Sequence, residues 1–161
     1  MRFKIICVGK IKETYYVNII ETYRKQIEKF HELKIIQYDD EKIPQNASES
    51  IKQRIVEKES SLCMTGIEKG DYVIALCIDG KKCTTKEFSR KIDEIRERGY
   101  QTVTFLIGGS LGMSEALIRK ADFKLSFSDM TFPHQLMRVM LMDQILSLIH
   151  ISEPTRLLSI S

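Results

Sequence analysis

Residues 102–112 read Thr-Val-Thr-Phe-Leu-Ile-Gly-Gly-Ser-Leu-Gly, an apolar run that ends in a glycine-rich turn. A second apolar run, Tyr-Val-Ile-Ala-Leu-Cys-Ile, spans residues 72–78 and lies between Gly-Asp and Asp-Gly pairs. Neither run alternates apolar with polar residues, so both predict strands that are covered on both faces, as in a parallel sheet. These two runs decide the fold class.

The rest of the chain extends the same pattern outward. Apolar, β-branched stretches at 2–8, 33–38 and 124–127 predict three further strands. Apolar residues at helical spacing predict helices at 14–31, 48–64, 84–99 and 114–120, with a last one from His134. Because strands and helices alternate throughout, we expect an α/β fold: a mainly parallel sheet with helices on both faces.

Composition excludes several classes of protein. The chain has 161 residues, and its 25 Lys and Arg nearly match its 22 Asp and Glu, for a net charge of +3. This balance excludes a polybasic protein that binds nucleic acid mainly by neutralising phosphates. The sequence has no membrane-spanning run and no signal peptide, which predicts a cytoplasmic protein without a membrane partner. Its four cysteines form no C-x-x-C pair, so we expect no metal.

Ligands of parallel sheets bind outside the carboxyl ends of the strands. Three loops occupy such ends here, at residues 76–80, 107–112 and 127–133. The glycines at 108–112 would let the backbone approach a ligand, although a simple tight turn explains them equally well. They do not match G-x-G-x-x-G, which disfavours a nucleotide-dependent oxidoreductase. In the third loop, the alternative to ligand binding is structural: the hydroxyl side chains would cap the following helix, and the aromatic side chains would pack in the core.

His134 and Arg138 are four residues apart on the last predicted helix. Arg138 is an isolated charge in an apolar stretch, which requires either a salt bridge across an interface or an anionic ligand. We favour the ligand. The apolar residues Met137, Met140, Leu141 and Ile145 of this helix predict a dimer interface.

Four motifs, in order along the chain, resemble the RlmH family of SPOUT-class methyltransferases. They are V-G-K at 8–10, the strand ending at Leu76, L-I-G-G-S-x-G at 106–112, and L-S-F-S-x-M-T-F-P-H-Q-x-M-R-V at 125–139. The resemblance runs from Met1 to about Ile145. The last motif is long and unusual, so chance agreement is a poor explanation.

The resemblance implies a C-terminal trefoil knot, a homodimer, and S-adenosyl-L-methionine held in the knot. It implies methylation of N3 of a pseudouridine in helix 69 of 23S rRNA on the assembled ribosome, with no DNA partner. The cofactor positions of the family correspond to Leu76, Gly108, Phe127, Ser128, Asp129, Met130, Thr131 and Phe132. For catalysis we hypothesise that His134 accepts the N3 proton and that Arg138 stabilises the developing anion or a phosphate.

The end of the chain departs from the family pattern. Residues 146–156, L-S-L-I-H-I-S-E-P-T-R, match codon by codon the translation of a transposase-based sequencing adapter. We therefore expect a native SPOUT domain at 1–145 and a non-native tail at 146–161 in place of the family C-terminus. The helix should continue a turn or two before Pro154 stops it, with disorder beyond. The alternative function is a non-catalytic ribosome- or RNA-binding module with the same fold, or an inactive truncated form.

Overall fold

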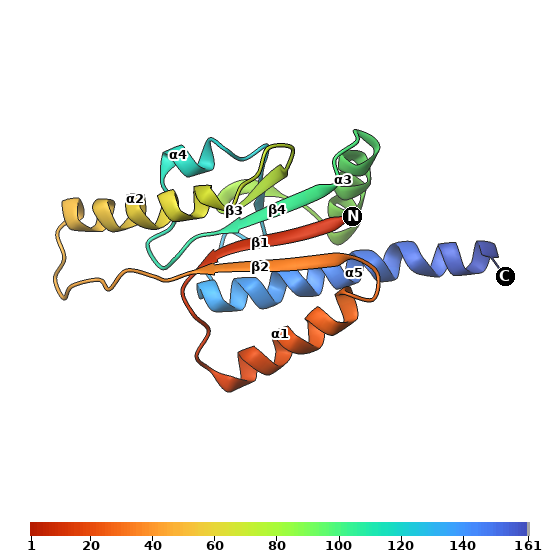
Figure 1. The fold of residues 1–161 in the computed structure, drawn as a ribbon, viewed down its shortest axis with the longest axis horizontal. Helices are drawn as coiled ribbons and strands as arrows, with labels where there is room; N and C mark the ends of the chain where they lie inside the picture. Colours follow the sequence, from red (N-terminus) through yellow and green to blue (C-terminus); the bar gives the residue numbers. More distant parts are fainter. Residues whose placement is uncertain (161) are drawn as a thin grey trace.

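The computed structural model describes residues 1–160, with side chains for residues 1–151. Five parallel strands form one sheet in the order β2-β1-β4-β3-β5 (Figure 1). The strands are β1 (Arg2–Val8), β2 (Glu32–Tyr38), β3 (Tyr72–Lys82), β4 (Thr102–Ile107) and β5 (Phe123–Ser126). The helices are α1 (Thr14–Ile27), α2 (Glu49–Thr65), α3 (Thr85–Glu97), α4 (Glu115–Ile118) and α5 (His134–Ile160). The predicted α/β class and mainly parallel sheet are confirmed.

Helices cover both faces of the sheet, as the unbroken apolar runs predicted. Alternate residues of β4 point to opposite faces: Phe105 joins a core with α1, α3 and α5, whereas Leu106 joins a core with α2 and α4. Figure 1 shows α2 and α4 on one side of the sheet and α1 and α5 on the other. Each face therefore has its own apolar core.

A buried ion pair replaces apolar packing near the start of β1. Lys4 is 2% exposed, and its Nζ lies 2.8 Å from a carboxylate oxygen of Asp71 and 2.8 Å from the carbonyl oxygen of Gly66. Asp71 also accepts hydrogen bonds from the Thr104 hydroxyl and the Glu68 amide. The charges are thus paired and hydrogen-bonded where water is excluded.

One helix boundary follows its local signal, and another departs from the prediction. Thr84 and Glu87 form the predicted capping box at the start of α3. The first helix, by contrast, ends at Ile27 rather than near residue 31, because the amides of Phe30 and His31 bond back to Ile27 in a closing turn.

Strand β3 is longer than its apolar run predicted. It extends to Lys82, because β5 pairs with it on both sides of an irregularity: Leu125 lies opposite Leu76 and again opposite Lys81. Between these partners, a Cβ on Gly80 would lie 2.8 Å from the backbone of Leu125. The segment from Leu76 to Lys81 thus folds closely around β5, and only glycine fits at Gly80.

Helix α5 differs from expectation in two respects. Leu141 and Ile145, predicted at a dimer interface, are fully buried in the chain's own core, because α5 packs against α1 and α3. The helix also continues to Ile160, past the predicted stop at Pro154. A proline removes one hydrogen bond, at a cost of about 3 kcal/mol, yet its fixed φ is compatible with a helix. Ser161 lies outside the described residues.

Candidate functional site

The three predicted loops meet at one cavity of about 550 Å³ at the carboxyl edge of the sheet. They meet because β4, β3 and β5 are adjacent and parallel, so their carboxyl ends point the same way. From the sequence, each of the three loops was a separate candidate for the site. In the structure all three line one cavity, and the volume of this cavity is in the usual range for small-molecule pockets.

Eight of the ten predicted site residues line this cavity. They are Leu76, Gly108, Phe127, Ser128, Met130, Thr131, Phe132 and His134. The other two, Asp129 and Arg138, are not among the lining residues. Sequence reasoning missed Ile78, Met113 and Met137, which also line the cavity. The sequence indicated these three residues only by their position, since each lies within five residues of a predicted site residue.

The glycine loop is shaped by close backbone contacts. A Cβ on Gly108 would lie 2.8 Å from the carbonyl carbon of Gly112, closer than real side chains approach. The turn is closed by a 2.9 Å hydrogen bond from the Gly112 amide to the Gly109 carbonyl, and Gly112 has a φ of +89°. Glycine is therefore required at Gly108 by space and at Gly112 by backbone conformation.

Hydroxyl side chains organise the loop that follows β5. The Ser126 hydroxyl donates a 2.9 Å hydrogen bond to the Ser128 carbonyl, and the Ser128 hydroxyl accepts one of 3.0 Å from the Met130 amide. Residues 127–133 belong to neither a strand nor a helix, so their backbone groups are not used by regular secondary structure. Asp129 instead forms an ion pair with Lys82 at the surface.

Arg138 binds protein groups in this structure, and its role toward an anion stays a prediction. The side chain is 3% exposed and donates hydrogen bonds to the carbonyls of Val8 and Gly9 and to the side chain of Gln37. Burial lowers the pKa of its guanidinium, and Cys7 and Asp40 oppose that shift. The carboxyl ends of β1 and β2 thus stabilise its charge.

His134 is the first residue of α5 and lies in the cavity wall. Burial, and then the positive charge of Arg138, lower the pKa of His134 from its ordinary value. Asp40 and Glu13 act in the opposite direction. The imidazole is thus neutral at pH 7, the state required of a proton acceptor.

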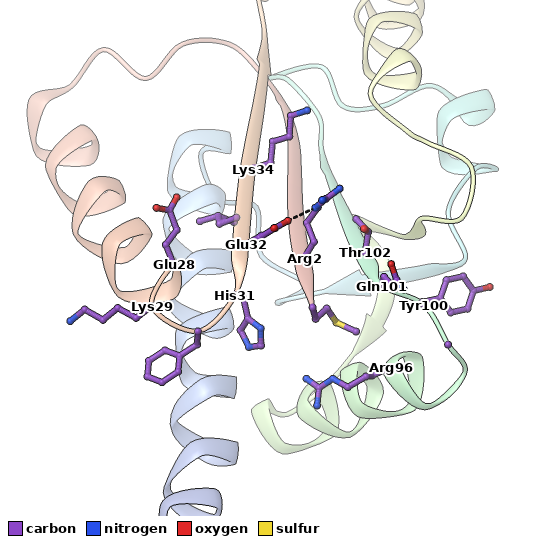
Figure 2. Close-up of a pocket in the computed structure, with 14 residues that line it drawn as sticks. Arg2, Glu28, Lys29, His31, Glu32, Lys34, Arg96, Tyr100, Gln101 and Thr102 are labelled. Atoms are coloured by element: carbon purple, nitrogen blue, oxygen red, sulfur yellow. Dashed lines mark hydrogen bonds and ion pairs between the residues drawn. The ribbon is translucent and has the colours of Figure 1, made fainter.

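A larger hollow of about 1280 Å³ lies at the opposite edge of the sheet, where β1, β2 and β4 begin (Figure 2). Figure 2 shows Arg2 paired with Glu32 across it, at a distance of 2.7 Å. The hollow is open and receives none of the three carboxyl-end loops. It therefore does not have the features expected of the ligand site of a parallel sheet.

Among the described residues, no group of three His, Cys, Asp or Glu side chains is arranged to hold a metal ion. Over the same residues, no helix is both long and apolar enough to cross a membrane.

Comparisons with known proteins agree with the predicted resemblance. Residues 1–155 match a family model described as "Predicted SPOUT methyltransferase". The "Ribosomal RNA large subunit methyltransferase H" of Clostridium botulinum (strain Kyoto / Type A2) is 47% identical over 145 residues, which cover 90% of this chain and 91% of the relative. The protein of that name from Streptococcus uberis is 44% identical over the same shares of each chain. A "Putative ribosomal RNA large subunit methyltransferase H" from Methanococcus maripaludis is 46% identical, again over those shares.

Proposed function

The chain belongs to the SPOUT methyltransferase family and to its RlmH group, and from this membership we propose that it methylates ribosomal RNA of the large subunit. The observation that carries the proposal is the single cavity formed by the three carboxyl-end loops. The methyl donor we propose for this cavity is S-adenosyl-L-methionine. The target we propose is N3 of a pseudouridine in helix 69 of 23S rRNA on the assembled ribosome.

The cavity wall suits an adenosine-containing ligand. Leu76 is apolar and lies where β3 meets the cavity, so it can pack against an adenine ring. Gly108 lines the cavity, where its backbone can approach a ribose or amino-acid moiety. The backbone of residues 127–132 offers donors and acceptors for the adenine edge. Ile78 is 54% exposed and Met130 70% exposed, and both line the cavity, so a ligand would cover apolar surface there.

The donor, when bound, supplies a methyl group on a sulfonium, which is a good leaving group. The protein then has to place the base nitrogen in line with that methyl group and remove the N3 proton. Neutral His134 in the cavity wall is the proton acceptor we propose. Arg138 has a positioning role. It lies one helical turn after His134 and binds the carbonyls of Val8 and Gly9, which keeps this segment against α5.

Basic side chains follow the carboxyl ends of strands, at the same edge of the sheet as the cavity. Lys10 and Lys12 follow the carboxyl end of β1, and Lys81 and Lys82 end β3, which points the same way. All four are exposed. Local positive charge on one edge fits contact with a folded ribosomal surface despite the small net charge.

Homodimerisation and the trefoil knot belong to the same proposal. Half-buried Met137 and Met140 on α5, rather than Leu141 and Ile145, are the residues of the predicted interface that keep exposed surface. The close folding of residues 76–81 around β5 is consistent with a threaded chain.

Two measurements test the function. Titration calorimetry should detect S-adenosylmethionine binding, and transfer of a tritiated methyl group should occur to ribosomes that lack the modification. Binding without transfer would favour a non-catalytic ribosome-binding module or an inactive truncated form. The absence of both would refute the proposal.

His134→Ala tests the proton acceptor. We expect methyl transfer to fall by about 10²–10⁴-fold, the usual contribution of a general base, with binding of S-adenosylmethionine intact. Unchanged turnover would remove His134 from the mechanism.

A further inference from the structure

Asp40 follows the carboxyl end of β2, and Gly9 follows the carboxyl end of β1, near His134 in the cavity wall. Gly9 follows β1 with a φ of +93°, and its amide donates a 2.7 Å hydrogen bond to the carbonyl of Tyr38. A Cβ built on Gly9 would lie 3.6 Å from Nε2 of His134 and 3.8 Å from Cβ and Cγ of Asp40. The imidazole and the carboxyl group therefore both lie close to the bare Cα of Gly9.

Asp40 lies in the loop after β2, and α2 fixes its neighbour. The amide of Glu41 donates a 2.8 Å hydrogen bond to the carboxylate of Glu59, which is 4% exposed. The Glu41 side chain forms a 2.9 Å ion pair with Lys58 on the same helix. Two contacts one residue beyond Asp40 thus limit how far its side chain can move from Gly9.

The backbone of Gly9 is held as well. Arg138 holds the carbonyls of Val8 and Gly9 from the next turn of the helix that begins with His134. The imidazole is consequently carried by α5, Arg138 binds the backbone of Gly9 beside it, and α2 binds Glu41, the residue after Asp40. Each component is placed by a different element of the fold.

We propose that the carboxylate of Asp40 balances the charge which the His134 imidazole gains on accepting a proton. The proposal rests on the function proposed above, in which His134 takes the N3 proton. In that step the N–H bond of the base breaks and its proton goes to a His134 ring nitrogen. The electron pair left on N3 then forms the bond to the methyl carbon, while the bond from that carbon to sulfur breaks.

The charges around His134 fit this role. Arg138, on the same helix, and burial disfavour the imidazolium, whereas Asp40 from the β2–α2 loop and Glu13 from the segment before α1 favour it. The first two keep the imidazole neutral before reaction. A carboxylate beside the ring reduces the cost of protonating it, as a buried or half-buried imidazolium requires a counter-charge.

Asp40→Asn tests the proposal against Asp39→Asn, which removes the same charge from the adjacent residue; both side chains are exposed. NMR titration of His134 in each variant is the first readout, and it needs neither donor nor RNA. We expect the pKa of His134 to fall in Asp40→Asn and to stay at the wild-type value in Asp39→Asn.

The second readout is the pH profile of methyl transfer. Asp40→Asn should slow transfer about tenfold, less than loss of the base itself, and move the acid limb of the profile to lower pH. Asp39→Asn should match the wild type.

If the pKa of His134 is the same in the two variants, the proposal is overturned, whether or not methyl transfer is observed. Wild-type protein that transfers no methyl group would refute the proposed function instead. In that case the NMR comparison would still decide whether Asp40 acts on His134.

Discussion

Replacing Gly108 with alanine puts a methyl group into the tightest part of the glycine loop. The new Cβ would lie 2.8 Å from the Gly112 carbonyl carbon and 2.9 Å from its oxygen. Carbon atoms in favourable contact are about 3.5–4.0 Å apart, so the two segments must separate by roughly 1 Å. The backbone of Gly112 cannot move that far without straining its 2.9 Å hydrogen bond to Gly109.

The cost follows from this displacement. Overpacking of this kind destabilises proteins by about 1–3 kcal/mol, which lowers the Tm of a chain of this size by about 5 °C. Because the loop also lines the cavity, we expect the affinity for S-adenosylmethionine to fall at least about tenfold, equivalent to about 1.4 kcal/mol. Thermal unfolding and titration calorimetry measure the two effects.

Gly70→Ala provides the matched control. Gly70 has a φ of +94° and no atom within 4 Å of a new Cβ, and it precedes β3, at the opposite edge of the sheet from the cavity. Alanine there costs about 1–2 kcal/mol through backbone strain alone. It should lower the Tm similarly and leave cofactor affinity unchanged. The reasoning fails if Gly108→Ala keeps wild-type affinity, or if Gly70→Ala loses it.

Three further predictions concern buried or half-buried groups. Lys4→Met leaves the Asp71 carboxylate buried without its cation and should lower the free energy of unfolding in urea by roughly 3–5 kcal/mol; a loss below about 1 kcal/mol would contradict a buried pair. Burial raises the pKa of Cys7 to about 11 and that of Cys63 to about 12, so iodoacetamide at about pH 8 should label neither thiol until urea unfolds the chain, as read by mass spectrometry. The lowered pKa of His134 means that the unfolded chain binds its proton more readily. The stability contribution is therefore complete above the ordinary histidine pKa of about 6.5 and is lost as pH falls below it; urea unfolding from about pH 8 to 5 should show this loss in the wild type and less of it in His134→Asn.

Much of the local structure was predictable because its causes are local. Apolar runs bounded by glycine predicted β4 within its exact bounds, and Thr84 with Glu87 predicted the start of α3. One of the errors came from a tertiary contact. The extension of β3 to Lys82 depends on pairing with β5, which no pattern within residues 72–82 reveals.

By itself, the sequence determined the strands, the parallel α/β class, the three candidate loops and the resemblance to a methyltransferase family. These depend on periodicity, glycine positions and motifs, which are properties of neighbouring residues. Tertiary structure alone decided that the loops share one cavity, that Arg138 binds the end of β1, and that Asp40 and His134 both lie close to Gly9. The physical reason is strand order: β2-β1-β4-β3-β5 joins residues about 100 positions apart, and hydrophobic periodicity specifies which face of a strand is buried but not which strand lies beside it.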